Sequence, residues 1–458
     1  MTEINKWVTH LIKNPVSIFP LIVFRITFGL ILFASTLRFI LKGWISDLYI
    51  KPTYFFTYYG FDWVRPVNSE VIYLIFFLLL LCSIMITLGL FYRISSLLFF
   101  ILFTYVELID KTNYLNHYYF ISLMSFLMIF LPANKFFSLD NVIGISKKVK
   151  TVYAWQINII KLQIGMVYLF AGVAKINFHW LVEAQPLTNW LKHQSDFPII
   201  GRFFLYDATA YLFSWGGAIF DLLIFFILAN KRWRIYGYFI VVIFHILTSV
   251  MFPIGVFPLV MIVSTLIFFS DKFHQKILSI MVNTKAHKSS EKIEDQHKNS
   301  YIMYLLVTFF VIQLLIPFRY LLYPGKLFWT EQGYRFSWRV MLIEKAGYAQ
   351  FYIHEPKMDR KMLIETRNYL TPQQEKMMST QPDMILQFAH YISSEFKDST
   401  ILETNGEIIK LGNKPKITAE VKVSLFNKGS KDFINQNTNL SMENRGFMNK
   451  EWILPYED

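Results

Sequence analysis

The chain has 458 residues, of which 54% are hydrophobic and only 17% are charged, and 46 of them are Phe. Soluble globular proteins are about a quarter charged, and a single soluble core of this length cannot bury so much apolar surface. The composition therefore excludes an ordinary water-soluble protein and indicates that lipid covers much of the chain. Cys82 is the only cysteine, which excludes an internal disulfide and a cysteine-ligated metal site.

Nine apolar runs follow one another along the chain. A membrane-spanning helix needs roughly 20 mostly apolar residues, and we expect the first run to remain as such a helix rather than to be cleaved as a signal peptide. The runs lie at residues 17–42, 71–92, 94–110, 117–133, 153–176, 205–230, 233–252, 254–270 and 301–323. They predict a polytopic α-helical membrane protein with about nine transmembrane helices.

The basic residues are concentrated in alternate connections between these runs. Those connections carry Lys6, Lys13, Arg93, Lys135, Lys147, Lys148, Lys150, Lys231, Arg232, Arg234 and the lysines between positions 272 and 298. Because positively charged loops stay in the cytoplasm, we expect a cytoplasmic N-terminus and, after nine spans, an extracytoplasmic C-terminal end. The net charge of +13 then reflects topology, and no nucleic-acid partner is expected.

Two domains are expected from the change in composition along the chain. Residues 1–323 form the transmembrane domain, in which the charged, Ser- and Lys-rich segment 271–300 is expected to be a cytoplasmic linker without fixed structure. After Pro324 the composition becomes that of a soluble protein. Residues 324–458 are therefore expected to form a small α+β domain on the extracytoplasmic side.

Inside this C-terminal domain the patterns of apolar residues predict individual elements. Residues 349–355 and 417–425 alternate between apolar and polar side chains, as half-buried strands do. Between them, the segment Pro372–Phe396 is typical of a helix, and Thr371 is its expected N-cap.

Four polar side chains lie at a similar depth in the apolar runs. Asn116 and His117 begin the fourth run and Lys175 ends the fifth. His245 lies roughly 12 residues into the seventh run, which is about 18 Å of helix rise. All four would then occupy the outer half of the membrane, toward the C-terminal domain. Because ionisable side chains are costly at such a depth, they indicate a functional site.

Each of these residues also has a purely structural explanation. A lysine at a helix end, such as Lys175, can extend to the lipid headgroups, the imidazole of His245 can hydrogen-bond to a neighbouring helix, and Asn116 can cap its own helix. For Asp221, in the sixth run, structural ion pairing is the expected role. Trp180 is expected to anchor the segment after Lys175 at the membrane interface.

Five stretches of the chain resemble stretches of known proteins, and they occur in the same order as in those proteins. They are Tyr92–Leu97 (YRISSL), Asp110–Tyr119 (DKTNYLNHYY), Tyr168–Trp180 (YLFAGVAKINFHW), Phe244–Met261 (FHILTSVMFPIGVFPLVM) and Gly333–Met341 (GYRFSWRVM). On these motifs the chain resembles the vitamin K-dependent gamma-carboxylase family. It is similar in type to short bacterial homologues with a horizontally transferred transmembrane (HTTM) domain.

The resemblance implies an integral membrane lyase that converts glutamate side chains to gamma-carboxyglutamate. In this family, vitamin K hydroquinone is oxidised by O2, the oxygenated quinone removes a proton from the glutamate gamma carbon, CO2 captures the carbanion, and the quinone leaves as its epoxide. The implied cofactor is reduced vitamin K or menaquinol, with O2 and CO2 as co-substrates and no metal. The implied partners are a Glu-containing peptide or protein and the lipid bilayer, and the implied location is a bacterial inner membrane.

The resemblance also implies roles for individual residues in catalysis and cofactor binding. Lys175 matches the catalytic lysine, whose uncharged amine would take a proton from the hydroquinone. Asn116 and His117 match an Asn-His pair that would position the hydroquinone oxygens and stabilise the oxyanion. His245 matches a further histidine of the same cofactor pocket.

Tyr334 and Trp338 lie in the stretch that matches the family's region for handling the glutamate substrate, and the resemblance implies that they bind this substrate.

The chain departs from the family's pattern in two places. Animal members carry a second lysine next to the catalytic one, where this chain has Ala174. They also continue past the equivalent of Asp458 with a region that helps to recognise a substrate propeptide, so the substrate of this chain is expected to be recognised by other means.

Two other functions fit the same expected fold. One is a quinone- or lipid-binding oxidoreductase without carboxylation, and the other is a non-enzymatic membrane protein of an export or assembly complex. In the carboxylase, replacement of Lys175 by alanine is expected to abolish activity while folding survives, and in the assembly protein it is expected to alter stability or nothing. The oxidoreductase is expected to bind quinone without incorporating CO2. A metal-dependent reaction is disfavoured, because His117, His179, His193 and His245 lack the i, i+4 spacing of helical metal ligands.

Overall fold

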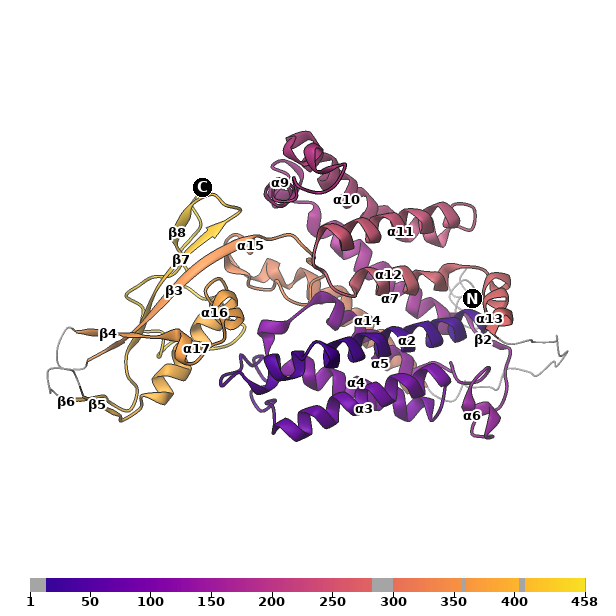
Figure 1. Ribbon diagram of the computed structural model, residues 1–458, viewed down its shortest axis with the longest axis horizontal. Helices are drawn as coiled ribbons and strands as arrows, with labels where there is room; N and C mark the ends of the chain where they lie inside the picture. The colour runs from indigo at the N-terminus through magenta and orange to yellow at the C-terminus, as the bar shows by residue number, and fades with distance from the viewer. Residues whose placement is uncertain (1–13, 282–299, 356–359, 403–407, 458) are drawn as a thin grey trace.

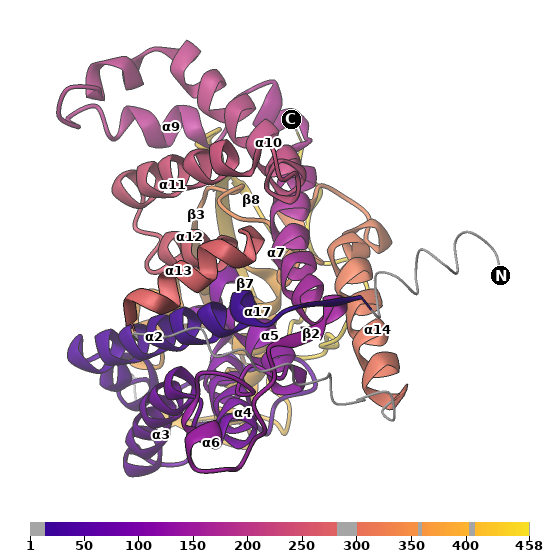
Figure 2. The ribbon, with the colours of Figure 1, turned by 90° about the vertical axis from the view of Figure 1, so that its right-hand side faces the viewer.

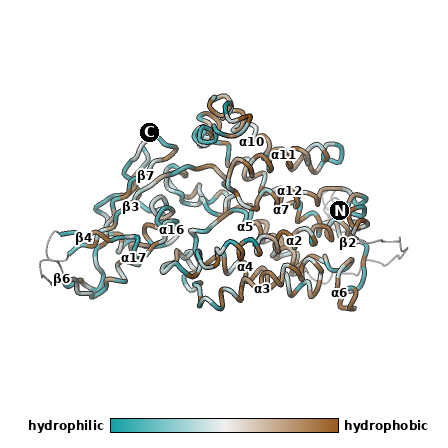
Figure 3. The backbone as a smooth tube through the Cα atoms, in the orientation of Figure 1, coloured by the Kyte–Doolittle hydropathy of each residue, from teal (hydrophilic) through white to brown (hydrophobic). Residues whose placement is uncertain are grey.

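Two parts make up the molecule, a bundle of long helices and a smaller domain of strands and helices that lies at one end of it (Figure 1). The computed structural model describes residues 14–281, 300–355, 360–402 and 408–457. Apolar residues dominate the bundle, whereas hydrophilic residues are frequent in the C-terminal domain (Figure 3). The predicted fold class, a helical membrane protein with a small α+β domain, is confirmed.

Seven helices in the described part of the chain are long and apolar enough to cross a membrane, or eight if one bent pair counts as a single span. Single α-helices form most of these spans: α2 (Phe19–Leu41), α3 (Ser69–Leu88), α4 (Tyr92–Ile109), α7 (Ala154–Lys175), α10 (Asp207–Ala229) and α11 (Arg234–Met251). The last span, Tyr301–Leu322, combines α14 (Ser300–Leu315) with the 3-10 helix η5 (Ile316–Leu322).

Two of the expected spans are short or broken, which makes the expected count of about nine approximate. The helix α5 (Asn116–Phe130) has 15 residues, because Pro132 follows soon after its end and proline cannot continue a helix. The helix α12 (Phe257–Ser264) continues as η4 (Thr265–Phe268) and then bends by 118° into α13 (Asp271–Met281).

The helix α13 corrects the expectation that residues 271–300 have no fixed structure. It packs against α2, and Leu278 on its apolar side is 4% exposed. Burial of one apolar side stabilises a helix even where the overall composition is polar. The rest of the expected linker, residues 282–299, lies outside the described residues.

The bundle consists of two groups of helices with α12 between them. Seen from its end, α2, α3 and α4 lie together, and α10 and α11 lie on the other side of α12 (Figure 2). A short antiparallel sheet of β1 (Pro15–Ser17) and β2 (Thr151–Tyr153) joins the segments before α2 and α7. In their most apolar windows, α2 and α7 are each 67% buried and α11 is 22% buried, so α2 and α7 are central and α11 is peripheral.

Two glycines allow α7 and α10 to approach each other closely. A Cβ atom at Gly165 would lie 2.5 Å from the ring of Phe225, and one at Gly172 would lie 2.8 Å from the backbone nitrogen of Leu222. Small residues at such positions let membrane helices pack with their backbones close together. The last turn of α7 is thereby held beside the middle of α10.

The C-terminal domain is built on a four-stranded antiparallel sheet with the order β4-β3-β7-β8. Its strands are β3 (Lys345–His354), β4 (Lys361–Ile364), β7 (Ile417–Leu425) and β8 (Ser430–Asp432). The central pair, β3 and β7, contains the two segments that the sequence predicts to be strands. A separate hairpin is formed by β5 (Thr400–Leu402) and β6 (Ile408–Lys410).

The helix predicted between these strands is two helices. Thr371 caps α16 (Pro372–Met378) as expected, because its hydroxyl oxygen accepts a hydrogen bond from the amide of Gln374. A second helix, α17 (Pro382–Glu395), begins at Pro382, whose ring fits the first turn of a helix but interrupts a longer one. Both helices pack against the sheet, α16 on β3 and α17 on β7.

A cluster of charged side chains joins the two parts of the molecule. Asp383, at the start of α17, has Oδ2 2.7 Å from Nζ of Lys111 and 2.8 Å from Nη1 of Arg335. Burial opposes the charge on Asp383, but Arg335 and Lys111 outweigh it and hold the pKa of this carboxyl well below its usual range. Because Lys111 lies between α4 and α5, the C-terminal domain is anchored next to the start of α5.

Candidate functional site

The last turn of α7 places the amine of Lys175 inside the bundle. Its Nζ lies 2.6 Å from Oδ2 of Asp221 on α10 and 3.5 Å from the carbonyl oxygen of Ala171. The ring of Trp180 lies 5.3 Å from the same amine. Lys175 is 6% exposed and Asp221 is 5% exposed, so the two charges are removed from water and depend on each other.

His245 approaches this pair from α11. Its Nε2 is 3.0 Å from the hydroxyl oxygen of Tyr168 on α7. The other ring nitrogen, Nδ1, is buried and has no hydrogen-bond partner among the residues that the structure describes. A buried polar atom without a partner is unusual in a folded protein, which makes this nitrogen a candidate contact for a bound molecule.

Lys175, Asp221, His245 and Tyr168 line one small cavity of about 100 Å³. The rest of its lining is mostly apolar and includes Phe257 from α12. A cavity of this size holds only a few water molecules. Three helices of the bundle, α7, α10 and α11, therefore bring an amine, a carboxylate and an imidazole together in a small, mostly apolar space.

Asn116 and His117 lie at the start of α5 and line a second, larger cavity of about 770 Å³. The Asn116 Nδ2 donates a hydrogen bond of 3.2 Å to the backbone carbonyl of Arg339, and its Oδ1 accepts one of 3.0 Å from the hydroxyl of Tyr114. The ring of His117 stacks on Phe257 with 5.8 Å between the ring centroids. These contacts hold both side chains at the wall of the larger cavity.

A shared wall separates the two cavities. Ile254, Phe257, Val340 and Met341 line both of them. The ring of Phe257 also lies 6.1 Å from that of His245, and it therefore contacts a histidine on either side. Lys175 and His245 thus face one cavity, while the expected Asn-His pair faces its neighbour.

The structure does not bring Tyr334 and Trp338 to either cavity, as far as the described lining residues show. Trp338 is fully buried and stacks on Tyr119 with ring centroids 4.9 Å apart. Tyr334 packs beside Phe328, 6.4 Å away between ring centroids, in the C-terminal domain. Both side chains therefore support the segment 333–341 rather than line these spaces.

The segment 333–341 is nevertheless close to the site through its last residues. Val340 and Met341 form half of the shared wall. Phe336, Trp338 and Met341 have positive φ angles of 61°, 57° and 55°, a backbone conformation that costs energy for residues other than glycine. Such strain persists only where the surrounding packing imposes it, as it does here at the wall of a candidate site.

Three contributors to the site are not identified by sequence reasoning as parts of it. Asp221 is expected only as a structural ion pair, Tyr168 is not singled out, and Trp180 is expected at the interface although it is 4% exposed. The visible signal for Asp221 is an acidic residue in the middle of an apolar run. Its partner, 46 residues earlier in the chain, becomes evident only from the packing of α7 on α10.

Comparisons with known families cover nearly the whole chain. The HTTM domain model matches residues 13–273, and the model of the vitamin K-dependent gamma-carboxylase lumenal domain matches residues 298–458. No solved structure matches the chain. The first match covers the bundle that holds Lys175, and the second covers the segment that completes the wall of its cavity. With both of its parts matched in this order, the chain belongs to the vitamin K-dependent gamma-carboxylase family.

Proposed function

We propose that this membrane protein is a gamma-glutamyl carboxylase, which couples the oxidation of a reduced naphthoquinone by O2 to the carboxylation of glutamate side chains by CO2. The observation that carries the proposal is the buried Lys175 amine, 2.6 Å from Asp221 in a small cavity beside His245. Membership of the family supports the use of vitamin K hydroquinone and of Glu-containing substrates. When bound, the reduced naphthoquinone and O2 supply a base stronger than any protein side chain.

Lys175 acts as the base that accepts a proton from a hydroquinone hydroxyl. An amine can do so only when it is uncharged. Asp221 Oδ2 lies within hydrogen-bond distance of Nζ and can hold the proton that the amine releases. The charged pair becomes a neutral pair when one proton moves from Nζ of Lys175 to Oδ2 of Asp221, and these two atoms are 2.6 Å apart.

The larger cavity suits the ring of a naphthoquinone. Its volume of about 770 Å³ falls in the usual range for small-molecule sites, and aromatic side chains line much of it. No hydrogen bond joins the ring of His117 to another described residue, so its nitrogens are available to a hydroquinone oxygen. Asn116 can contribute its amide if it exchanges the carbonyl of Arg339 for the ligand.

The shared wall stands between a naphthoquinone ring in the larger cavity and the proposed base, Lys175. A ring held by His117 lies on the opposite side of Phe257 and Met341 from Lys175. Proton transfer over hydrogen-bond distance therefore requires one of these two side chains to rotate when the cofactor binds. Closure around the ligand then keeps water from the reactive species.

The orientation in the membrane follows the distribution of basic loops. We infer a cytoplasmic N-terminus and an extracytoplasmic C-terminal domain, in agreement with the match of that domain to a lumenal domain. In a bacterium this corresponds to the inner membrane with the domain outside it. Tyr334 and Trp338 keep the segment 333–341 in place beside the pocket, and this is how they would affect the glutamate substrate.

A carboxylation assay with two matched variants tests the proposal. The purified protein in nanodiscs receives vitamin K hydroquinone or menaquinol, labelled bicarbonate and a Glu-rich peptide. Lys175→Ala is compared with Lys161→Ala, which removes a lysine from the same helix at a place 5.7 Å from the ring of Phe268. Labelled peptide and quinone epoxide are expected from the wild type and from Lys161→Ala, and neither is expected from Lys175→Ala.

Three results would contradict the proposal. Epoxide without labelled peptide, for every Glu-rich peptide tried, would support an oxidoreductase that does not carboxylate. Full activity in a folded Lys175→Ala protein would show that another group is the base. Absence of both products with either quinol, from a protein that unfolds cooperatively on heating, would favour a non-enzymatic role.

A further inference from the structure

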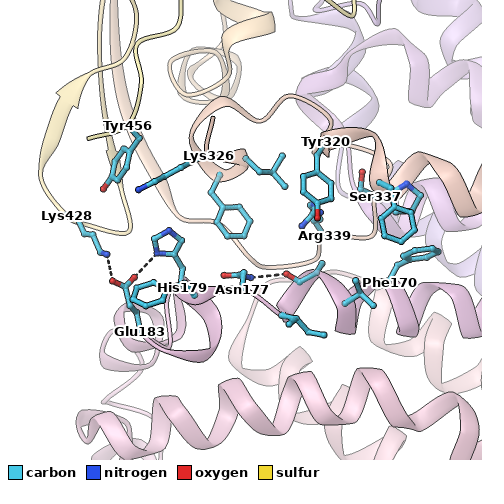
Figure 4. A pocket seen from close by; sticks show the side chains of 18 of the residues that line it. Phe170, Asn177, His179, Glu183, Tyr320, Lys326, Ser337, Arg339, Lys428 and Tyr456 are labelled. Carbon is cyan, nitrogen blue, oxygen red and sulfur yellow. Dashed lines mark hydrogen bonds and ion pairs between the residues drawn. The ribbon is translucent and has the colours of Figure 1, made fainter. Parts of the chain in front are cut away.

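Contacts between the C-terminal domain and the bundle extend to both groups of helices. Beside α7 the two parts enclose a cavity of about 790 Å³, where the amine of Lys428 lies 2.6 Å from the carboxylate of Glu183 (Figure 4). Beside α3 and α4, residues 57–67 of the bundle meet residues 441–449 of the C-terminal domain. We call these two segments the bundle loop and the domain loop.

The bundle loop is fixed to the ends of two spanning helices. It is followed by Asn68, whose side chain caps α3 by accepting a hydrogen bond from the amide of Val71. In the last turns of α4, the hydroxyl of Tyr105 donates a hydrogen bond of 2.6 Å to the carbonyl of Arg65. Because spans leave the hydrocarbon core of the bilayer at their ends, the loop lies at the depth of the lipid headgroups.

The bundle loop directs large apolar side chains outward. Val64 is 1% exposed and belongs to the core of the bundle, whereas the neighbouring Trp63 is 77% exposed. The ring of Phe61 lies 6.5 Å from that of Trp63, and Val67, just before α3, is also exposed. On α3 itself Phe77 is exposed, and lipid covers such a side chain on a span. The outward side chains of the loop therefore begin next to the lipid-covered surface of α3.

The domain loop contributes a second set of outward apolar side chains. Phe447 is 71% exposed and Met448 is 84% exposed. Leu440 and Ser441, where the segment begins, are buried in the C-terminal domain, so the domain holds the base of the loop while its tip projects. Exposure of large apolar side chains to water is unfavourable, and a group of them indicates a surface that another molecule or a membrane covers.

Two contacts join the bundle loop and the domain loop into one surface. The rings of Tyr59 and Phe447 lie 5.2 Å apart in an edge-to-face arrangement. Between the loops, Nη1 of Arg445 lies 2.7 Å from Oδ1 of Asp62, and the same carboxylate oxygen accepts a hydrogen bond of 2.6 Å from the hydroxyl of Thr57. The tip of the domain loop is thereby held beside a loop at the depth of the headgroups.

We propose that Phe447 and Met448 insert into the headgroup region of the bilayer beside Trp63 and so anchor the C-terminal domain to lipid. Aromatic side chains are favoured in this region, and burial of apolar side chains away from water is stabilising. The lipid around α3 reaches the bundle loop, and the contact of Phe447 with Tyr59 puts the domain loop next to it. The bilayer then adds to the attachment that Asp383 provides.

Spin labels on single cysteines test this proposal in the full chain, reconstituted in nanodiscs of phosphatidylcholine and phosphatidylglycerol. Cys82, the only native cysteine, is buried and is replaced by alanine. Labels are attached at Met448→Cys, at Phe77→Cys on the lipid-covered surface of α3, and at Leu363→Cys. Leu363 is 49% exposed and lies on β4, at the end of the domain away from the bundle (Figure 1).

The quantity measured is the ratio of the collision rates of each label with O2 and with a water-soluble nickel chelate, since O2 concentrates in lipid and the chelate in water. We expect the ratio at Met448→Cys to be severalfold higher than at Leu363→Cys and lower than at Phe77→Cys. Equal ratios at Met448→Cys and Leu363→Cys would overturn the proposal. Leu363→Cys carries the same apolar label, so insertion driven by the label alone would raise both ratios.

A Glu-rich peptide in the same experiment distinguishes lipid from a protein partner. Added in excess, the peptide should leave the ratio at Met448→Cys unchanged, because lipid already covers the tip of the loop. A ratio typical of water that changes only when the peptide is added would assign the domain loop to a peptide and overturn the proposal. Because the accessibility of a label is measured, these outcomes do not depend on whether the protein carboxylates glutamate.

Discussion

Lys175 and Asp221 link stability and chemistry at the level of single side chains. A buried ion pair is maintained only while both partners are present, since each charge alone would be strongly unfavourable in an apolar surrounding. In this protein the same pair contains the proposed base and the group that can hold its proton. Structural and catalytic effects of a substitution at Lys175 must therefore be measured separately.

Removal of one partner of this pair should destabilise the protein more than removal of both. We expect Asp221→Leu to lower the free energy of unfolding by about 3–5 kcal/mol, and Lys175→Met/Asp221→Leu to recover most of this loss without recovering carboxylation. Thermal unfolding in detergent measures the first effect, and the labelled-bicarbonate assay measures the second. Asp207→Asn, in an exposed pair on the same helix, is the control and should cost at most about 1 kcal/mol.

Phe257 should control how tightly quinol oxidation is coupled to carboxylation. Its ring belongs to the wall between the two cavities, and Phe257→Ala would join them and admit water to the reactive species. We expect the ratio of fixed label to quinone epoxide to fall severalfold, while epoxide continues to form. An unchanged ratio in a folded variant would mean that the wall has no part in coupling.

Individual residues also show the limit of inference from sequence at this scale. The polarity of Lys175 and His245 inside apolar runs was sufficient to predict a functional site, and the structure places both in one cavity. Their partners Asp221 and Tyr168 could not be assigned, because the choice depends on which helices pack together. Trp180 was expected at the interface, but its indole donates a hydrogen bond to the carbonyl of Ser214 and is buried.

At the scale of elements, the close packing of α7 on α10 sets the geometry of the site. Gly172→Ala would put a Cβ atom 2.8 Å from the backbone nitrogen of Leu222, so the helices would have to separate. We expect a loss of about 1–3 kcal/mol in unfolding free energy and a larger relative loss of carboxylation, because Lys175 and Asp221 would move apart. Thermal unfolding and activity of the same preparation measure the two effects.

Gly216 provides a matched control for this prediction. It lies on α10, and no atom lies within 4 Å of a Cβ atom built there. Gly216→Ala should therefore be neutral or stabilise the protein by up to about 1 kcal/mol, since alanine is the better helix former. Equal effects of the two substitutions would contradict a role for close helix packing.

Elements were predictable where a local pattern determines them. Long apolar runs predicted the spans, and alternation predicted β3 and β7. The errors arose where packing competes with composition: α13 is helical because the core buries Leu278, although its surroundings in sequence are charged. Pro382 was a visible signal for the division of the predicted helix into α16 and α17, and the proline could have been read as the start of a second helix.

For the whole molecule, Asp383 should determine how firmly the C-terminal domain is attached. Asp383→Asn leaves Lys111 and Arg335 without their shared carboxylate. Because the carboxyl is 37% exposed, we expect a loss of about 1–3 kcal/mol, less than for a fully buried pair. Asp432→Asn, in an exposed pair with Lys422, should cost at most about 1 kcal/mol; similar melting temperatures of the two variants would contradict the prediction.

The same variant has an expected pH dependence. A carboxyl whose pKa is lowered on folding adds stability above its unfolded pKa of about 3.9, and this stability is lost only as the pH falls through the lower, folded value. Because Arg335 and Lys111 hold the pKa of Asp383 well below its usual range, the difference in melting temperature between wild type and Asp383→Asn should be the same at pH 5 and pH 7. A difference that disappears at pH 5 would mean that the carboxyl is protonated there in the folded protein, so that its pKa is raised on folding rather than lowered.

The cavity around Lys175 is lined by segments that are far apart in the sequence and are therefore synthesised at different times. Ile254 and Phe257 emerge with the bundle, whereas Val340 and Met341 follow later and are held in position by the C-terminal domain. A nascent chain therefore lacks these two residues of the shared wall until the C-terminal domain has been made. Under the proposed function, we therefore expect a chain that ends before Val340 to be unable to oxidise a quinol.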